Sequence, residues 1–239
     1  MVFSVARWKW ANWIEFDVSY TKDKQNIVAH GEYLYDSSCK NLKIKNYKYD
    51  WIKEHCILKN WEKYRTLQDM LEIVDGLFDY YFLEIKVYNE SLGIQQAKEA
   101  IQTVKDLNMQ DRVIFITYSD AARKVLNADQ DIIFWWDTFD ANDLDFIWEN
   151  NSKYFLAPYD IMTPDIVQKA KSLWKDVVTY TVNDTKIYQS MKDLWINIIM
   201  TDNLNLLQEY EKYYPLKHTF KTINLKNLQE VLEDFSIRE

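Results

Sequence analysis

The chain is poor in residues that break secondary structure, with only three glycines and three prolines among 239 residues. Cysteine is scarcer still, because Cys39 and Cys56 are the only two. They lie 17 positions apart and match no Cys-x-x-Cys or Cys/His pattern of a zinc site. We therefore expect two free thiols in a cytosolic protein, and one disulfide is the alternative for an exported form.

The chain also lacks an excess of positive charge and any long apolar run. Its net charge of −8 excludes an extended nucleic-acid-binding surface, which needs clustered lysine and arginine. No apolar run approaches the length of about 18 residues that a membrane span needs. The first ten residues show no signal-peptide pattern. We expect a cytoplasmic protein without a membrane span, and an exported form stays open if the N-terminus is incomplete.

What the chain does contain is a series of apolar, strand-like segments separated by segments of helical periodicity. This alternation is typical of parallel strands joined by right-handed crossover helices. Polar or charged residues at the C-terminal ends of the strands favour a TIM-type (β/α)8 barrel over an open sheet. The strand candidates are Trp13–Ser19, Tyr81–Val87, Arg112–Tyr118, Ile132–Asp137, Lys153–Tyr159, Asp176–Val182 and Ile196–Thr201.

Local capping signals mark the starts of several helices. Thr66 and Asp69 form a Thr-x-x-Asp cap before an apolar run that ends at Val74. Thr163 precedes Pro164, which suits the first helical position. Further helices are expected at Glu90–Leu107, at Ile187–Leu194 after a cap at Asn183 or Asp184, and at Leu206–Tyr213.

Two segments fall outside the alternating pattern. Residues 31–65 are rich in tyrosine and tryptophan, and we expect a compact insertion over the active face, because a structureless loop of that length is improbable inside a domain. Its aromatic residues form either a local core or the lining of a substrate mouth. Residues 214–239 predict a C-terminal helical tail. The expected domains are thus a barrel over residues 1–213, with the insertion inside it, and the tail.

Acidic residues lie within strands that are otherwise apolar. Glu15 and Asp17 are two positions apart, so both carboxylates project from one face of their strand. Glu84 and Lys86 share one face of a later strand in the same way. Buried carboxylates are costly unless a cation compensates them, and oxygen ligands suit Mg²⁺ or Ca²⁺. The pattern predicts a site in which Glu15, Asp17 and Glu84 bind a divalent cation and Lys86 contacts a phosphate. A solvated acidic strand is the alternative for the first pair alone.

In this pattern the chain resembles the glycerophosphodiester phosphodiesterase family. The resemblance extends over about residues 3 to 212 and lies in five motifs in the family's order, each weak alone. The motifs are Glu15-Phe16-Asp17-Val18, Thr21-Lys22-Asp23, Ile27-Val28-Ala29-His30, Leu83-Glu84-Ile85-Lys86, and the pair Tyr180-Thr181-Val182-Asn183-Asp184 and Ile198-Ile199-Met200-Thr201-Asp202.

The resemblance implies metal-dependent hydrolysis of glycerophosphodiesters to glycerol 3-phosphate and an alcohol in a TIM barrel. Glu15, Asp17 and Glu84 would be ligands of one Ca²⁺ or Mg²⁺ ion, and Lys86 would contact phosphate. His30 would be one of two acid–base histidines. Tyr180 takes a position usually held by tryptophan, where it lines the leaving-group side or simply fills the barrel. The implied partner is a small-molecule substrate.

The chain departs from the family in two places. Gly31 follows His30 where the family commonly has aspartate, and the adjacent Glu32 is a candidate to compensate. The family's first strand, which ends in His-Arg-Gly, has no counterpart before Glu15, where Phe3, Ala6, Trp10 and Trp13 instead have helical spacing. We therefore expect a TIM-type (β/α)8 barrel that lacks its first strand, carries an insertion after the second and has unpaired edges at the strands near Trp13 and Ile196.

Three functional hypotheses remain open at this point. The first is a phosphodiesterase whose sequence is incomplete at the N-terminus. The second is a non-catalytic barrel that binds phosphate or metal, because one catalytic histidine is missing; His55 and His218 are expected to be surface residues. The third is a phospholipase D-like lyase that acts on lysolipids or sphingomyelin, although the Glu84-x-Lys86 motif favours the first.

Overall fold

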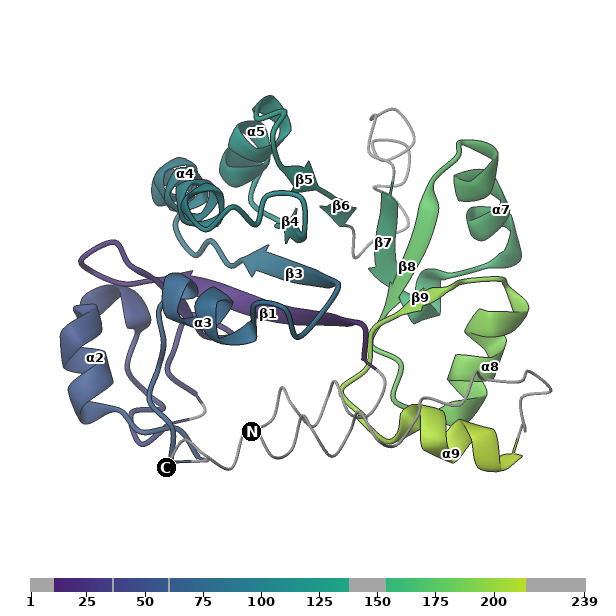
Figure 1. The fold of residues 1–239 in the computed structure, drawn as a ribbon, viewed down its shortest axis with the longest axis horizontal. Helices are drawn as coiled ribbons and strands as arrows, with labels where there is room; N and C mark the ends of the chain where they lie inside the picture. Colours follow the sequence, from purple (N-terminus) through teal and green to yellow (C-terminus); the bar gives the residue numbers. More distant parts are fainter. Residues whose placement is uncertain (1–10, 36, 60, 138–153, 214–239) are drawn as a thin grey trace.

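The computed structural model describes residues 11–35, 37–59, 61–137 and 154–213 (Figure 1). One sheet pairs β1 (Trp13–Tyr20), β3 (Tyr80–Ile85), β4 (Val113–Ile116) and β5 (Ile133–Phe134) in parallel. A second pairs β6 (Trp136–Asp137), β7 (Tyr154–Pro158), β8 (Asp176–Tyr180) and β9 (Ile198–Ile199), also in parallel. Trp135 lies between β5 and β6, and its backbone N–H donates to the carbonyl of Phe115 in β4 at 2.9 Å, so the two sheets continue into each other.

Helices alternate with the parallel strands along the chain. They are α3 (Leu67–Val74), α4 (Glu90–Asp106), α5 (Asp120–Ala128), α7 (Pro164–Ser172), α8 (Thr185–Asp193) and α9 (Leu206–Tyr213). Figure 1 shows α4 and α5 along one part of the strand arc and α7, α8 and α9 along the other. The fold is the predicted TIM-type barrel. Within the described residues, β1 and β9 are not paired with each other, so the barrel is open between them.

Local capping explains where the helices begin. Thr66 accepts from the Asp69 N–H and Asp69 accepts from the Thr66 N–H, which confirms the predicted capping box of α3. Thr163 caps α7, with Pro164 at its first position. Of the two predicted caps for α8, Asp184 is the one used. Helix α5, capped by Ser119, was not expected from the sequence.

Alternation along the strands divides the core into an inner and an outer layer. Phe82, Ile114, Leu156 and Val178 point into the barrel and pack around the buried Trp135. The outer faces of β1, β3 and β4 pack on α3, α4 and α5, and those of β7 and β8 pack on α7 and α8. In the described part of the barrel the interior is thus filled with side chains, which leaves its mouth, at the C-terminal ends of the strands, as the place for a site.

The segment between β1 and α3 contains one further strand. The run ending at His30 forms only the short strand β2 (Asn26–Val28), which pairs antiparallel with the end of β1 and is not a barrel strand. This pairing covers the C-terminal part of the β1 edge. The rest of the edge, from Trp13, stays unpaired within the described residues, and Trp13 itself belongs to β1 and not to a helix.

Beyond β2 the chain forms a compact unit with its own small core. It contains the helical turn η1 (Ile44–Asn46) and helix α2 (Tyr49–His55). Tyr49 and Tyr64 are buried in its core, whereas Tyr35 and Trp61 are exposed. The aromatic residues therefore divide between a local core and the surface.

The two cysteines form a disulfide within this unit, so the expectation of free thiols is wrong. The Cα atoms of Cys39 and Cys56 are 5.4 Å apart. The reason is the antiparallel bridge of Ser37 with Leu58, which brings the two segments together in a way that spacing alone does not reveal.

Some predictions fall on residues whose structure is not described. The tail at 214–239 and the residues Phe3, Ala6 and Trp10 lie outside the described residues. None of the described helices is long and apolar enough to cross a membrane.

Candidate functional site

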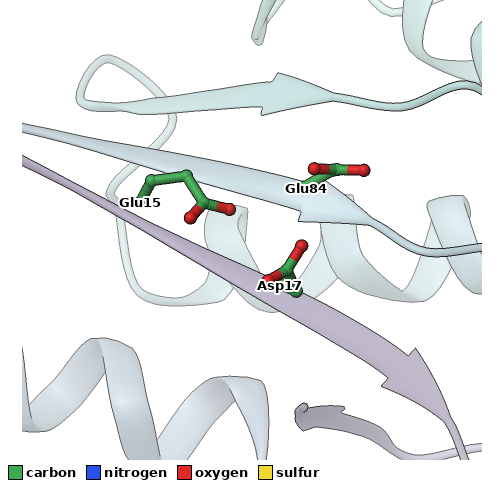
Figure 2. A group of neighbouring side chains, drawn as sticks. All are labelled: Glu15, Asp17 and Glu84. Carbon is green, nitrogen blue, oxygen red and sulfur yellow. The ribbon is translucent and has the colours of Figure 1, made fainter. Parts of the chain in front are cut away.

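The register of β1 and β3 brings the predicted carboxylates together. Asp17 and Glu84 are partners in this parallel ladder, so their side chains leave the same face side by side. Glu15, two positions before Asp17, projects from that face as well. One oxygen of each carboxylate lies within 4.8 Å of the others (Figure 2). The three predicted metal ligands therefore form one cluster in the barrel mouth, above the inward-facing Phe82.

Lys86 lies in the same cluster. Its Nζ is 3.2 Å from Asp17 Oδ1 and 2.5 Å from Glu84 Oε1. The Lys86 N–H donates to the Val18 carbonyl at 2.9 Å, and the buried Gln96 of α4 donates to the carbonyls of Val18 and Lys86 at 3.4 Å. These contacts fix the backbone where β3 ends, and the ammonium group is held over the two acids.

The crowding of charges shifts the pKa values in the cluster. Desolvation, followed by repulsion from Asp17 and Glu84, raises the pKa of Glu15 well above its usual range. Glu15 is the most exposed of the three residues, but its carboxyl group is surrounded by protein groups. Desolvation also raises the pKa of Glu84, against the attraction of Lys86. For Lys86, desolvation is outweighed by the two carboxylates, and its pKa is raised.

The cluster fits a divalent cation. Glu84 Oε1 is buried and, apart from its ion-pair contact with Lys86, accepts no hydrogen bond of regular geometry within the described part of the chain. Buried oxygens are normally satisfied, so this one has capacity for a further partner. Three carboxylates and no thiol or imidazole are a donor set for a hard ion such as Mg²⁺ or Ca²⁺.

His30 reaches the cluster from the turn after β2. The N–H of Ala29 donates to the Asp17 carbonyl at 3.0 Å. Desolvation raises the pKa of Glu84, and His30 lies near enough to oppose that rise. The buried hydroxyl of Ser19 lies 3.0 Å from the Ala29 carbonyl and 2.9 Å from that of Gly31. Ser19 thus holds the backbone on both sides of His30, a positioning role that the sequence pattern did not suggest.

The residues after His30 turn away from it. Gly31 has a φ of 106°, which suits glycine, and a Cβ there would lie 2.9 Å from the Tyr35 ring. Glu32 Oε1 lies 3.1 Å from the ammonium groups of both Lys43 and Lys45. The carboxylate of Glu32 therefore forms ion pairs within the insertion. The expectation that it compensates for the missing aspartate beside His30 is not supported.

Two tyrosines meet across the mouth. The hydroxyl of Tyr118, after β4, lies 2.8 Å from that of Tyr180, at the end of β8. Lys86 Nζ lies 6.0 Å from the centroid of the Tyr118 ring. Tyr180 therefore faces the mouth through its hydroxyl as well as its ring. Tyr118 was missed because a tyrosine after a strand carries no distinctive sequence signal.

The side-chain amide of Asn183 joins the segments after β8 and β9 by hydrogen bonds. Asn183 Oδ1 accepts from the Thr201 hydroxyl at 3.0 Å and from the Asp202 N–H at 2.9 Å, and Asn183 Nδ2 donates to the Asp202 carboxylate at 3.3 Å. Asp202 lies close enough to contribute to the raised pKa of Glu15. The two C-terminal motifs thus meet at the mouth, near the acids of β1.

Comparison with protein families gives one match. The model described as the glycerophosphoryl diester phosphodiesterase family matches residues 3–206. No curated protein matches the chain.

Solved structures share the fold at low sequence identity. A glycerophosphodiester phosphodiesterase from Parabacteroides distasonis is 23% identical, with a TM-score of 0.73 over 87% of this chain and 85% of its own. A phosphodiesterase from Oleispira antarctica, in complex with the product sn-glycerol-3-phosphate, is 17% identical with a TM-score of 0.78, covering 88% and 89%. A glycerophosphodiester phosphodiesterase from Thermotoga maritima is 21% identical with a TM-score of 0.70, covering 87% and 88%.

Proposed function

The chain belongs to the glycerophosphoryl diester phosphodiesterase family, and on that premise we propose that it hydrolyses glycerophosphodiesters to glycerol 3-phosphate and an alcohol. The observation that carries the proposal is the cluster of Glu15, Asp17 and Glu84 with Lys86 between two of them. This arrangement combines a cation-binding set of oxygens with a fixed positive charge at the mouth of a TIM barrel, where such enzymes place their chemistry.

Glu15, Asp17 and Glu84 would hold the divalent cation, Mg²⁺ or Ca²⁺. When bound, the cation supplies Lewis-acid polarisation of the phosphoryl oxygens and neutralises developing charge. Lys86 binds a phosphate oxygen as a point charge: an ammonium group has three N–H donors, and two of them face Asp17 and Glu84. The raised pKa keeps Lys86 charged at neutral pH.

His30 carries the proton. Hydrolysis breaks the bond from phosphorus to the alcohol oxygen, forms a bond from phosphorus to the water oxygen and moves one proton to the departing alkoxide. An imidazole titrates near neutral pH and can take or give that proton. Ser19 holds the backbone around His30 for this task. Tyr180, with Tyr118, lines the mouth near Lys86 and contacts the substrate through its hydroxyl.

A second candidate is a barrel that binds metal and phosphate without turnover. The observation that favours it is the engagement of Glu32 with Lys43 and Lys45, because this carboxylate is then not available to orient His30. Both candidates share the cation cluster, so they differ only in whether a bound diester is cleaved.

One experiment separates the candidates. Glycerophosphocholine is incubated with the full chain and Mg²⁺ or Ca²⁺, and the phosphorus species are followed by ³¹P NMR. The proposed function predicts glycerol 3-phosphate. An unchanged diester that still binds the chain supports the non-catalytic barrel, and a cyclic phosphate supports a lyase.

Two matched variants show whether a product comes from this site. Glu84→Gln removes one charge from the cluster and should abolish turnover. Glu72→Gln makes the same chemical change on the exposed face of α3 and should leave turnover as in the wild type. Equal activity of both variants would overturn the assignment of the site.

A further inference from the structure

Three helices of the barrel end in the same kind of turn. After α4, α7 and α8 the helix closes on a leucine, and the next residue has a left-handed backbone. These residues are Asn108, Trp174 and Trp195, with φ values of 54°, 58° and 61°. In each turn the left-handed residue and the one after it donate their N–H groups back to the last helical turn, at distances of 2.8–3.1 Å. This is the Schellman motif, in which glycine or asparagine is the usual left-handed residue.

Trp174 and Trp195 are therefore unusual at these positions. A side chain with a Cβ is disfavoured at positive φ, and only glycine and, less often, asparagine or aspartate adopt it routinely. Asn108, at the end of α4, shows that this fold also makes the turn with asparagine, one of the usual residues at the left-handed position. Nothing in the turn itself requires an indole.

The two indoles also contribute little to the core. Trp174 is 90% exposed and Trp195 is 77% exposed, and Leu173 beside them is 40% exposed. Large apolar side chains at such exposure in neighbouring turns indicate an interaction surface. We call Leu173, Trp174 and Trp195 the tryptophan face.

Lys171 joins the two turns. Its Nζ donates to the carbonyls of Leu194 and Trp195 at 3.0 and 3.1 Å, while its own carbonyl accepts from the Trp174 N–H at 3.0 Å. The two tryptophans therefore belong to one face of the molecule.

Charge near the face differs in sign from the charge of the whole chain. Exposed Lys169, Lys171 and Lys192 outnumber exposed Asp176 and Asp193, although the chain carries a net charge of −8. Lysines beside tryptophans at one end of a molecule are typical of a surface that meets lipid headgroups.

The size and shape of the face distinguish a membrane from a protein partner. An aromatic side chain buries about 150–250 Å², so two tryptophans and a leucine offer at most about 600 Å². A stable protein interface takes about 800 Å² from each partner. Exposed indoles at the tips of turns suit the bilayer interface, where the amphipathic ring lies at headgroup level and needs no complementary pocket.

We propose that the tryptophan face binds the chain peripherally to a phospholipid bilayer, with Trp174 and Trp195 inserted among the headgroups and the lysines favouring anionic lipid. The turns lie before the N-terminal ends of β8 and β9, whereas Asp17 and Glu84 of the acidic cluster lie in the C-terminal halves of β1 and β3. A chain bound in this way keeps the mouth of the barrel toward water. This proposal does not depend on the proposed function.

The test is sedimentation of the full chain with vesicles of equal parts phosphatidylcholine and phosphatidylglycerol. The double variant Trp174→Asn/Trp195→Asn puts the residue of the third turn at both positions. We expect it to bind ~tenfold more weakly than the wild type, with an unchanged or higher melting temperature because asparagine suits the left-handed backbone. Lost binding cannot then be attributed to unfolding.

Trp61→Asn is the matched control. Trp61 is 86% exposed with a φ of 67°, but it lies in the insertion. We expect its variant to bind vesicles as the wild type does. Wild-type chain that stays in solution, a double variant that still binds, or an equal loss in Trp61→Asn would each overturn the proposal. So would self-association of the wild type in sedimentation velocity that the double variant abolishes, because the face would then serve a second copy.

Discussion

Asp17 and Glu84 lie opposite each other in the register of β1 and β3, and both carboxylates contact one ammonium group, that of Lys86. The cation that we assign to phosphate binding thus also compensates two acids while no metal is bound. A divalent cation would take over that compensation. Stability and ligand binding are therefore coupled through these three side chains, and the coupling makes the site testable without a substrate.

Lys86→Met tests this coupling. Removing the ammonium leaves two largely buried carboxylates without their cation, which costs about 2–4 kcal/mol of unfolding free energy in a metal-free chain. Saturating Mg²⁺ or Ca²⁺ should restore most of the loss, since the metal neutralises the same carboxylates. Urea denaturation with and without metal measures both effects.

Lys98→Met is the control for that experiment, because Lys98 is exposed on α4. We expect only a small change in this variant, with no dependence on metal. A Lys86→Met chain as stable as the wild type without metal would contradict the coupling.

The raised pKa of Glu15 makes the metal-free chain less stable as pH rises. Above about pH 4.5 the unfolded carboxyl has lost its proton, while the folded one retains it. The folded state then binds more protons than the unfolded state, so the unfolding free energy falls until the pH passes the folded pKa. Denaturation curves in a chelator, taken from about pH 4.5 to 8, should show this fall.

Glu15→Gln should flatten this pH dependence and raise the melting temperature of the metal-free chain, because it removes the repulsion from Asp17 and Glu84. The same variant should lose the stabilisation that metal gives the wild type. The opposite result, a Glu15→Gln chain that is less stable without metal, would show that the carboxylate is not crowded.

Ser19→Ala tests how His30 is positioned. The variant leaves the carbonyls of Ala29 and Gly31 without a buried hydroxyl donor, at a cost of about 1–2 kcal/mol. We expect kcat for glycerophosphocholine to fall several-fold with KM nearly unchanged, because the proton carrier is misplaced and the binding groups are not. Ser172→Ala, which removes an exposed hydroxyl bonded to the Lys169 carbonyl, should change neither constant.

Cys39→Ala/Cys56→Ala tests the disulfide. It opens a closed loop of 17 residues and should lower the unfolding free energy by about 3 kcal/mol. Hydrogen exchange should rise in residues 31–65, with metal affinity unchanged, since the ligands are on β1 and β3. Native wild-type chain that reacts with a thiol reagent without reductant would contradict the bond.

Local signals accounted for much of what the sequence predicted correctly. The caps at Thr66 and Thr163 involve residues within one helical turn, so they can be predicted from the sequence without knowledge of the tertiary structure. The shared face of Glu15 and Asp17 follows from the two-residue period of a strand. The contact of Lys86 with Asp17 depends on the register between β1 and β3, which periodicity does not encode.

The errors concern contacts between distant segments. Cys39 and Cys56 meet because the insertion folds back on itself, and β2 pairs antiparallel because the turn after β1 is short. Glu32 is only two positions from His30 in sequence but pairs with Lys43 and Lys45. The hydroxyl pair of Tyr118 and Tyr180 crosses the barrel mouth, and the sequence gives no sign of it.

The most direct test of the site is titration of Mg²⁺ or Ca²⁺ into metal-free chain by isothermal calorimetry, with Glu84→Gln and Glu72→Gln in parallel. We predict that the wild-type chain binds one ion, and that it binds more tightly as pH rises because protons must leave Glu15 and Glu84. Glu72→Gln should bind the ion as the wild type does, and Glu84→Gln should not bind it. Equal binding by all three chains, or no binding by the wild type, would contradict the assignment of Glu15, Asp17 and Glu84 as the cation site.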